Sequence, residues 1–220
     1  MSEQSAPDDL AAFSNHRAAL AARVTPRAVG IRLPFMETGV AAALAASSPA
    51  GVGPAAGAAM PHHRSTVSFT LNGERRRTDV ANRTTVLDWL RQEAGLTGVK
   101  KGCNEGACGT CTVLIDGKRM NACLTLVAQC AERDIVTIEG IAGPGGALHP
   151  VQQSFIDHDA FQCGYCTPGQ ILSAIACIQE GHATDEASVR EWMSGNICRC
   201  SAYPQITAAV LDARSRMERA

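Results

Sequence analysis

The chain has 220 residues, of which 45% are hydrophobic and only 4% aromatic, and its formal net charge is −1. This length gives room for one or two small domains. The near-neutral charge excludes a nucleic-acid-binding protein that relies on a basic surface for its phosphate contacts. Ten cysteines, none of them before Cys103, indicate a disulfide framework, metal sites or redox chemistry.

Residues 1–64 do not have the pattern of a folded domain. Scattered arginines precede an uncharged stretch at 38–63 that is rich in Ala, Gly, Ser and Pro and too weakly apolar to span a bilayer. The stretch Arg32–Met36 resembles part of a twin-arginine export leader, with Leu33 in the position of the second arginine. Two interpretations stay open: a leader for export to the periplasm, or an unstructured tail on a cytoplasmic protein.

The next segment, residues 65–140, has the pattern of a small α+β domain. Apolar and polar residues alternate from Thr66, and both Asn72-Gly73 and Asp116-Gly117 are hairpin turn signals. Thr84 or Thr85 can cap a short helix that ends before Gly95. The expected elements are strands at 66–71 and 74–80, a helix at 86–90, a Cys/Gly-rich loop at 98–110, a hairpin at 112–115 and 118–123, and a last strand at 134–139.

Residues 148–216 form a second predicted domain, which is entirely helical. It follows a linker at 140–147 that contains four glycines and a proline. Proline at the first helical position marks three of the helix starts. The predicted helices begin near His149, at Thr167 with Ile171, Ile175 and Ile178 on one stripe, at Asp185, and at Tyr203.

A first set of four cysteines has the spacing C-x4-C-x2-C followed by a fourth cysteine after eleven residues: Cys103, Cys108, Cys111 and Cys123. This is the plant-type [2Fe–2S] spacing, in which a loop surrounds the cluster and a distant strand supplies the last thiolate. Gly102, Gly106 and Gly109 leave room for backbone amides to approach the negatively charged sulfurs. Structural zinc sites favour two C-x2-C knuckles, so the x4 gap favours iron–sulfur over zinc.

A second set combines a C-x2-C pair with a C-x-C pair that follows after thirty-one residues: Cys163, Cys166, Cys198 and Cys200. Both pairs lie at predicted helix ends, so they can converge on one site. Spacing alone allows zinc, disulfides or a second cluster. A C-x-C pair does not easily close on itself as an unstrained disulfide, which favours a shared metal centre.

Three runs of residues resemble motifs of one protein family. Gly102–Cys111 is similar to the first cluster motif of the xanthine dehydrogenase/aldehyde oxidase family of molybdenum hydroxylases, and Gln162–Gly169 with Asn196–Cys200 is similar to the second. The resemblance covers roughly residues 65–215, with both motifs complete and in the same order. With the leader considered, it is nearest to the iron–sulfur subunits of periplasmic aldehyde oxidoreductases.

The resemblance implies a β-grasp ferredoxin domain followed by a four-helix bundle, each with one [2Fe–2S] cluster. It implies that electrons pass from a molybdenum cofactor in a large subunit through both clusters to FAD in a medium subunit. Gln162 matches the family glutamine that contacts the molybdopterin. The sequence has no nucleophile–base pair, Walker loop or dinucleotide fingerprint, so we expect catalysis in another chain.

Two rival hypotheses remain at this point: a zinc- or disulfide-stabilised binding module, and a free diffusible ferredoxin. The second domain is hard to explain in a free ferredoxin. Cys130 and Cys177 belong to neither set, and we expect both in the core as small apolar residues. Trp89 and Trp192 are expected to be core anchors.

Overall fold

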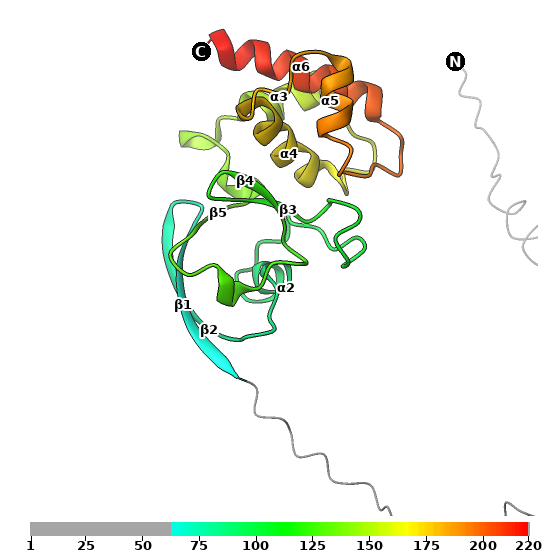
Figure 1. Cartoon of the computed structure of the whole chain (residues 1–220). Helices are drawn as coiled ribbons and strands as arrows, with labels where there is room; N and C mark the ends of the chain where they lie inside the picture. The colour runs from blue at the N-terminus through cyan, green and yellow to red at the C-terminus, as the bar shows by residue number, and fades with distance from the viewer. Residues whose placement is uncertain (1–62, 220) are drawn as a thin grey trace, which may run out of the picture. The chain divides into compact units, whose positions relative to one another are not determined.

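The computed structural model describes residues 63–219, so the predicted leader lies outside the described residues except for its last two positions. The described part contains five strands and five α-helices (Figure 1). The strands are β1 (Arg64–Leu71), β2 (Glu74–Ala81), β3 (Thr112–Ile115), β4 (Lys118–Asn121) and β5 (Asp134–Val136). The helices are α2 (Val86–Gln92), α3 (Pro150–Asp157), α4 (Thr167–Gln179), α5 (Glu186–Trp192) and α6 (Tyr203–Arg219). The predicted α+β class is confirmed.

The strands form one mixed sheet in the order β2-β1-β5-β3-β4. β1 and β2 are an antiparallel hairpin, β5 lies parallel to β1 and antiparallel to β3, and β3 and β4 form the second hairpin. Both predicted turns are present, with positive φ at Asn72 and Gly73 and at Asp116 and Gly117. Consecutive residues with positive φ are what a two-residue hairpin turn of the right twist requires.

Helix α2 packs on the sheet and completes the first core. Thr85 is its N-cap, and the Thr85 hydroxyl accepts the amide of Asp88 at 3.1 Å. Trp89 lies edge-on against Phe69 with ring centroids 5.1 Å apart, and its indole N–H donates to Thr78 Oγ1 at 3.2 Å. Trp89 is therefore a core anchor, as predicted, and Cys130 lies fully buried in the same core.

The helices α3 to α6 surround a second core centred on α4. Residues 169–177 of α4 are all buried, so this part of the helix is covered on every side. The buried face is therefore wider than the single stripe of isoleucines that the sequence predicted. Cys177 lies in this core and is fully buried, as predicted. His149 caps α3, because its Nδ1 accepts the amide of Val151 at 3.2 Å.

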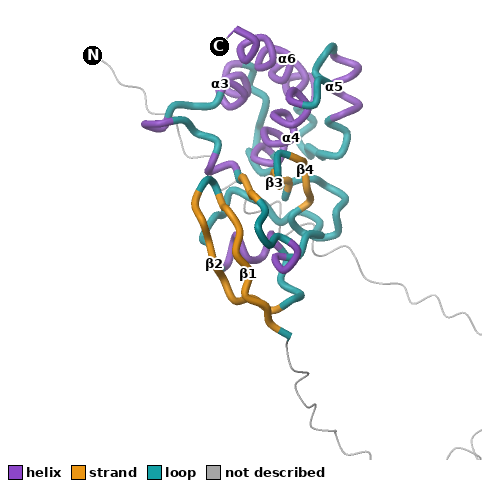
Figure 2. The backbone as a smooth tube through the Cα atoms, turned by 60° about the vertical axis from the view of Figure 1, so that its left-hand side comes forward, coloured by secondary structure: helices purple, strands orange, loops and turns teal. Residues whose placement is uncertain are grey.

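The two cores meet at β3, which is buried on both faces. Val113 and Ile115 point into the sheet core, whereas Leu114 belongs to the helical core. Figures 1 and 2 both show α4 beside β3 and β4. Across this contact Arg119 of β4 forms an ion pair with Glu180 and donates to the Trp192 carbonyl at 2.6 Å.

Three expectations differ from the structure. β4 ends at Asn121, and β5 ends at Val136 before a 3₁₀ turn at Ile138–Gly140, so both strands are shorter than predicted. Trp192 is 43% exposed, so it is not a core anchor. Its ring is stacked on His182 with centroids 3.4 Å apart, at the surface end of α5.

No helix within residues 63–219 is long and apolar enough to cross a bilayer.

Candidate metal centres

The β3–β4 hairpin positions half of the first cysteine set. Cys111 directly precedes β3, and Cys123 follows β4 after one residue. Thr112 pairs with Asn121, and the Ala122 amide donates to the Cys111 carbonyl at 3.2 Å, so the ladder holds both cysteines at one end of the hairpin. The Cys123 thiol is near enough to Cys111 to contribute to raising its pKa.

The other two cysteines of the first set, Cys103 and Cys108, lie in the loop between α2 and β3. Backbone amides of this loop donate hydrogen bonds to their Sγ atoms. The Glu105 and Ala107 amides donate to Cys103 Sγ at 3.4 and 3.3 Å, and the Cys103 amide donates to Cys108 Sγ at 3.4 Å. A Cβ on Gly102 would lie 2.8 Å from Cys108 Sγ. The loop thus presents several N–H dipoles to two sulfur atoms, which suits thiolates bound to a negatively charged cluster.

The thiols of this first site differ in acidity. Hydrogen bonding, chiefly from the Glu105 amide, lowers the pKa of Cys103 to about 7. Burial, followed by the neighbouring Cys123, raises the pKa of Cys111 to about 12. A buried thiol of this kind is deprotonated at neutral pH only when a metal cation supplies the compensating charge.

The second cysteine set lies in two connections between helices. Cys163 and Cys166 are in the α3–α4 connection, and Cys198 and Cys200 are in the α5–α6 connection. The thiols influence each other's acidity across the two connections, Cys200 acting on the pKa of Cys163 and Cys198 on that of Cys166. The Tyr165 amide, followed by Cys200, lowers the pKa of Cys163, whereas burial raises the pKa of Cys166 to about 12.

Both sites therefore consist of paired cysteines. All ten cysteines lie in the described part of the chain, and all are free thiols, so the structure does not favour a disulfide framework. Within residues 63–219 no three His, Cys, Asp or Glu side chains are placed to hold a single metal ion. Two pairs of thiolates around one centre match a [2Fe–2S] cluster, in which each iron takes two protein ligands.

Thr167 provides a second indication that the helical site fits a sulfur-rich group. Its hydroxyl is the only buried side-chain N or O atom without a hydrogen-bond partner among the described residues. It directly follows Cys166 at the start of α4. Buried hydroxyls in native proteins are nearly always paired, so this donor fits an acceptor bound at the cysteines.

Gln162 lies at the exposed edge of the second site. It immediately precedes Cys163, and both residues are exposed. Two large apolar side chains close to it in the sequence are exposed: Phe161 (38%) and Tyr165 (47%). Such a group of exposed apolar residues is typical of a surface that binds another protein.

Three residues near the thiols were not predicted: Thr110, Asn196 and Tyr203. Thr110 Oγ1 lies 3.2 Å from Cys108 Sγ. The Cys198 amide donates to Tyr203 Oη at 2.9 Å. Asn196 joins the two sites through hydrogen bonds described below. All three lie within five residues of a predicted ligand, and Thr110 and Asn196 also lie in the motif runs Gly102–Cys111 and Asn196–Cys200, which are the sequence signals that could have singled them out.

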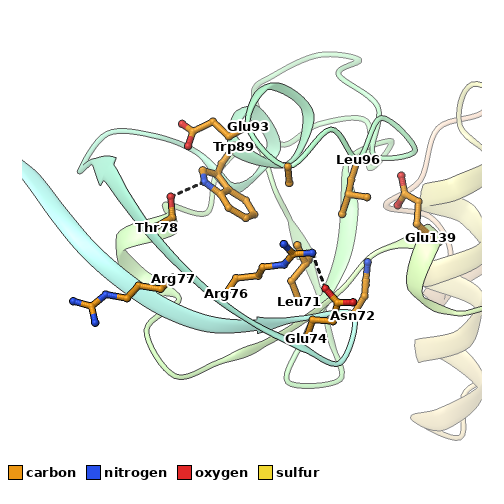
Figure 3. A pocket seen from close by; sticks show the side chains of 11 residues that line it. Leu71, Asn72, Glu74, Arg76, Arg77, Thr78, Trp89, Glu93, Leu96 and Glu139 are labelled. Atoms are coloured by element: carbon orange, nitrogen blue, oxygen red, sulfur yellow. Dashed lines mark hydrogen bonds and ion pairs between the residues drawn. The ribbon is translucent and has the colours of Figure 1, made fainter.

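A cavity of about 500 Å³ lies away from both cysteine sets, between β2, α2 and the turn after β5 (Figure 3). Its lining is a mixture of apolar side chains and charges of both signs, including Trp89, Arg76, Glu93 and Glu139. No cysteine lines it. Neither cysteine set is therefore part of this cavity.

Two family models match the chain, and their limits agree with the two sites. A 2Fe-2S iron-sulfur cluster binding domain matches residues 69–131, and a [2Fe-2S] binding domain matches residues 137–211. The aldehyde oxidoreductase iron-sulfur-binding subunit PaoA of Escherichia coli is 46% identical, over 69% of this chain and 72% of that protein. The chain belongs to the iron–sulfur subunits of the molybdenum hydroxylase family.

Other members of this family agree with the assignment. The nicotine 6-hydroxylase small subunit of Paenarthrobacter nicotinovorans is 44% identical, over 70% of this chain and 92% of that protein. The crystal structure of quinoline 2-oxidoreductase from Pseudomonas putida superposes with a TM-score of 0.67 at 42% identity, over 71% of this chain and 97% of that one. The predicted family is confirmed: the chain carries two [2Fe–2S]-binding domains and is a subunit of an oxidoreductase, and the zinc or disulfide module is not favoured.

Proposed function

We propose that this chain relays electrons within a heteromeric molybdenum hydroxylase, from a molybdenum-cofactor-binding large subunit towards an FAD-binding medium subunit. The observation that carries the proposal is that one compact unit contains two sets of four cysteines, each within a segment that matches a [2Fe–2S]-binding family model. When bound, a [2Fe–2S] cluster at each site supplies a one-electron carrier. Oxidation of the substrate, an aldehyde or an N-heterocycle, then takes place in the large subunit.

The chain itself holds the clusters and tunes their surroundings. The eight ligands that we assign are Cys103, Cys108, Cys111 and Cys123 for the first cluster, and Cys163, Cys166, Cys198 and Cys200 for the second. Amide donors at Cys103 and Cys108 stabilise negative charge on the first site, and burial excludes water from Cys111 and Cys198. Hydrogen bonding and burial of this kind set the reduction potential of a cluster.

We assign the first site to a β-grasp, plant-type ferredoxin domain over residues 65–140. The mixed sheet with α2 packed on it and the long loop before β3 support this assignment. The second site is assigned to a four-helix bundle over residues 148–216, supported by α3 to α6 packed around α4. In this scheme residues 140–147 connect the two domains.

The exposed apolar group around Gln162 supports a contact with the large subunit at the second site. Gln162 is assigned as the residue that reaches the molybdopterin of that subunit, next to the ligand Cys163. At the first site Leu124, beside Cys123, is 63% exposed, and we assign this surface to the FAD-binding subunit. Electrons would then enter through the helical domain and leave through the ferredoxin domain.

The test is the iron, sulfide and zinc content of the anaerobically purified chain, together with EPR of the dithionite-reduced protein. About four iron and four sulfide per chain, with two distinct [2Fe–2S] signals, are expected. Cys123→Ser and Cys163→Ser should each remove or alter one signal and leave the other, whereas Cys177→Ala should leave both. Zinc in place of iron, or a colourless chain, would contradict the proposal.

We further propose that residues 1–64 export the folded chain to the periplasm. The support is the arginine-containing stretch around Arg32 and the small residues near Ala56–Ala59, although Leu33 replaces the second arginine. The test compares the full chain with a chain that starts at His63, by fractionation and N-terminal mass measurement. Periplasmic, shortened protein is expected only from the full chain, and a cytoplasmic location for both would contradict export.

A further inference from the structure

Two adjacent hydrogen bonds join the loops that carry the two cysteine sets, in addition to the exposed bond from the Tyr165 hydroxyl to the Lys101 carbonyl. The Ile197 amide donates to the Cys108 carbonyl at 2.9 Å, and Asn196 Nδ2 donates to the Gly109 carbonyl at 2.9 Å. Ile197 directly precedes Cys198. A short path of covalent bonds and one hydrogen bond therefore connects a ligand of the second site with a ligand of the first.

Asn196 is buried, at 7% exposure, and both ends of its side-chain amide are used. Nδ2 also lies 3.3 Å from Thr112 Oγ1, and Oδ1 accepts the hydroxyl of Ser173 at 2.7 Å. The Asn196 carbonyl accepts Gln170 Nε2 at 3.0 Å. One residue thus links α4, the loop of the second site and the loop of the first site, and its partners allow only one orientation of the amide.

The Gly109 carbonyl at this junction accepts three donors. Besides Asn196 Nδ2, it accepts Thr112 Oγ1 at 2.7 Å and the Thr112 amide at 3.1 Å. A Cβ on Gly109 would lie 2.7 Å from Asn196 Nδ2 and would collide with the Gly195 carbonyl. The missing Cβ of Gly109 therefore allows this close approach, whereas a Cβ on Gly195 would meet no atom within 4 Å.

We propose that Asn196 is a positioning residue that fixes the separation of the two cluster-binding loops and so sets the electronic coupling between the two clusters. The inference rests on the proposed relay function. Electron tunnelling and magnetic interaction both weaken steeply with distance, so a small shift of one loop against the other changes both. Asn196 contacts the backbone of the first site without being a ligand of either site.

The test uses the full chain with both clusters bound and compares Asn196→Asp with Ser173→Ala. Asn196→Asp keeps the shape but replaces the donor to Gly109 with an acceptor, whereas Ser173→Ala removes only the hydrogen bond on the opposite side. The first readout is the magnetic splitting between the two reduced clusters in EPR. The second is hydrogen exchange of the Ile197 amide, which reports on the bond to Cys108.

We expect Asn196→Asp to keep both clusters, to lose or change the splitting, and to exchange the Ile197 amide about tenfold faster, which corresponds to one lost hydrogen bond. Ser173→Ala should retain the wild-type splitting. Unchanged splitting and exchange in Asn196→Asp would overturn the inference. If the wild-type protein shows no splitting, the rate of hydrogen exchange at the Ile197 amide alone tests the inference.

If Asn196→Asp fails to bind iron, Thr112→Val tests the inference instead. This variant keeps Asn196 and all ligands but removes one donor to the Gly109 carbonyl. A smaller change in the same direction supports the inference, and wild-type behaviour overturns it. Failure of the relay function itself is recognised separately, because it appears in the wild-type chain as missing iron or a missing second [2Fe–2S] signal.

Discussion

Tyr203 at the start of α6 accepts the backbone amide of Cys198 through its phenol oxygen, at 2.9 Å. Cys198 is only 4% exposed, so this amide has little access to water. Tyr203→Phe keeps the ring and removes the acceptor, and a buried amide without a partner costs about 1–3 kcal/mol. We expect the variant to bind both clusters but to lose the second-site EPR signal faster than wild type during heating.

Tyr165→Phe is the matched control for this prediction. The Tyr165 phenol also makes one hydrogen bond, to the Lys101 carbonyl at 2.8 Å, but this residue is 47% exposed. Water can replace that bond, so its removal should change stability by less than about 0.5 kcal/mol. Equal loss of the second signal in both variants would show that the Tyr203 bond to Cys198 has no special effect.

Thr110 is expected to tune the reduction potential of the first site. Its hydroxyl lies 3.2 Å from Cys108 Sγ and 3.3 Å from the Lys100 carbonyl. A thiolate and a carbonyl can only accept, so with the cluster bound the hydroxyl is the donor and its single proton is shared between Cys108 Sγ and the Lys100 carbonyl. If that bond favours the reduced state by about 1 kcal/mol, Thr110→Val lowers the potential by about 40 mV for a one-electron couple.

Redox titration followed by EPR measures this shift, with the second-site potential as an internal reference. Thr110→Ser retains the donor and should stay close to wild type. Equal shifts in the valine and serine variants would attribute the effect to packing of the methyl group instead.

Cys130 and Cys177 should be the unreactive cysteines of the folded chain. Burial raises the pKa of both thiols above the ordinary value of 9.0. A raised pKa lowers the thiolate fraction at neutral pH, so alkylation should become appreciable only as the pH rises above about 9. Iodoacetamide labelling with mass spectrometry should leave these two unmodified after iron is chelated, while Cys103 and Cys163, whose pKa values are lowered and whose side chains are not buried, react. Early labelling of Cys130 or Cys177 would contradict their core role.

Local chemistry was sufficient to predict much of the fold. The Asn72-Gly73 and Asp116-Gly117 turns and the Thr85 cap depend on residues next to one another in the sequence, and all three are present. The eight ligands assigned from the two cysteine spacings and the family resemblance stay a prediction. Strand ends were less predictable, because they depend on the partner strand: β4 ends opposite Thr112, the first residue of β3, and β5 pairs with β3 only at Leu114 and Ile115.

Features that depend on distant residues were not predictable. Tryptophan is a residue type that is common in cores, but the neighbours of Trp192 are His182 and Arg119. Arg119 is 73 positions away in the sequence, and its guanidinium lies over the Trp192 ring. The partners of Asn196 are up to 87 positions away. No local pattern in one sequence specifies such contacts, so the junction between the two sites became visible only in three dimensions.

Gly169 in the first turn of α4 should be intolerant of even a methyl group. A Cβ there would lie 2.5 Å from the Gly109 carbonyl oxygen and 3.2 Å from the Thr110 backbone, which cannot move without displacing the first-site loop. Alanine favours a helix by about 1 kcal/mol over glycine, but overpacking against backbone costs about 1–3 kcal/mol. We therefore expect Gly169→Ala to lower the melting temperature and to alter the first-site EPR signal, although no ligand changes.

Gly195→Ala is the control, because a Cβ there meets no atom within 4 Å. A Gly169→Ala variant as stable as Gly195→Ala, with an unchanged spectrum, would show that the helical domain does not press on the loop of the first site.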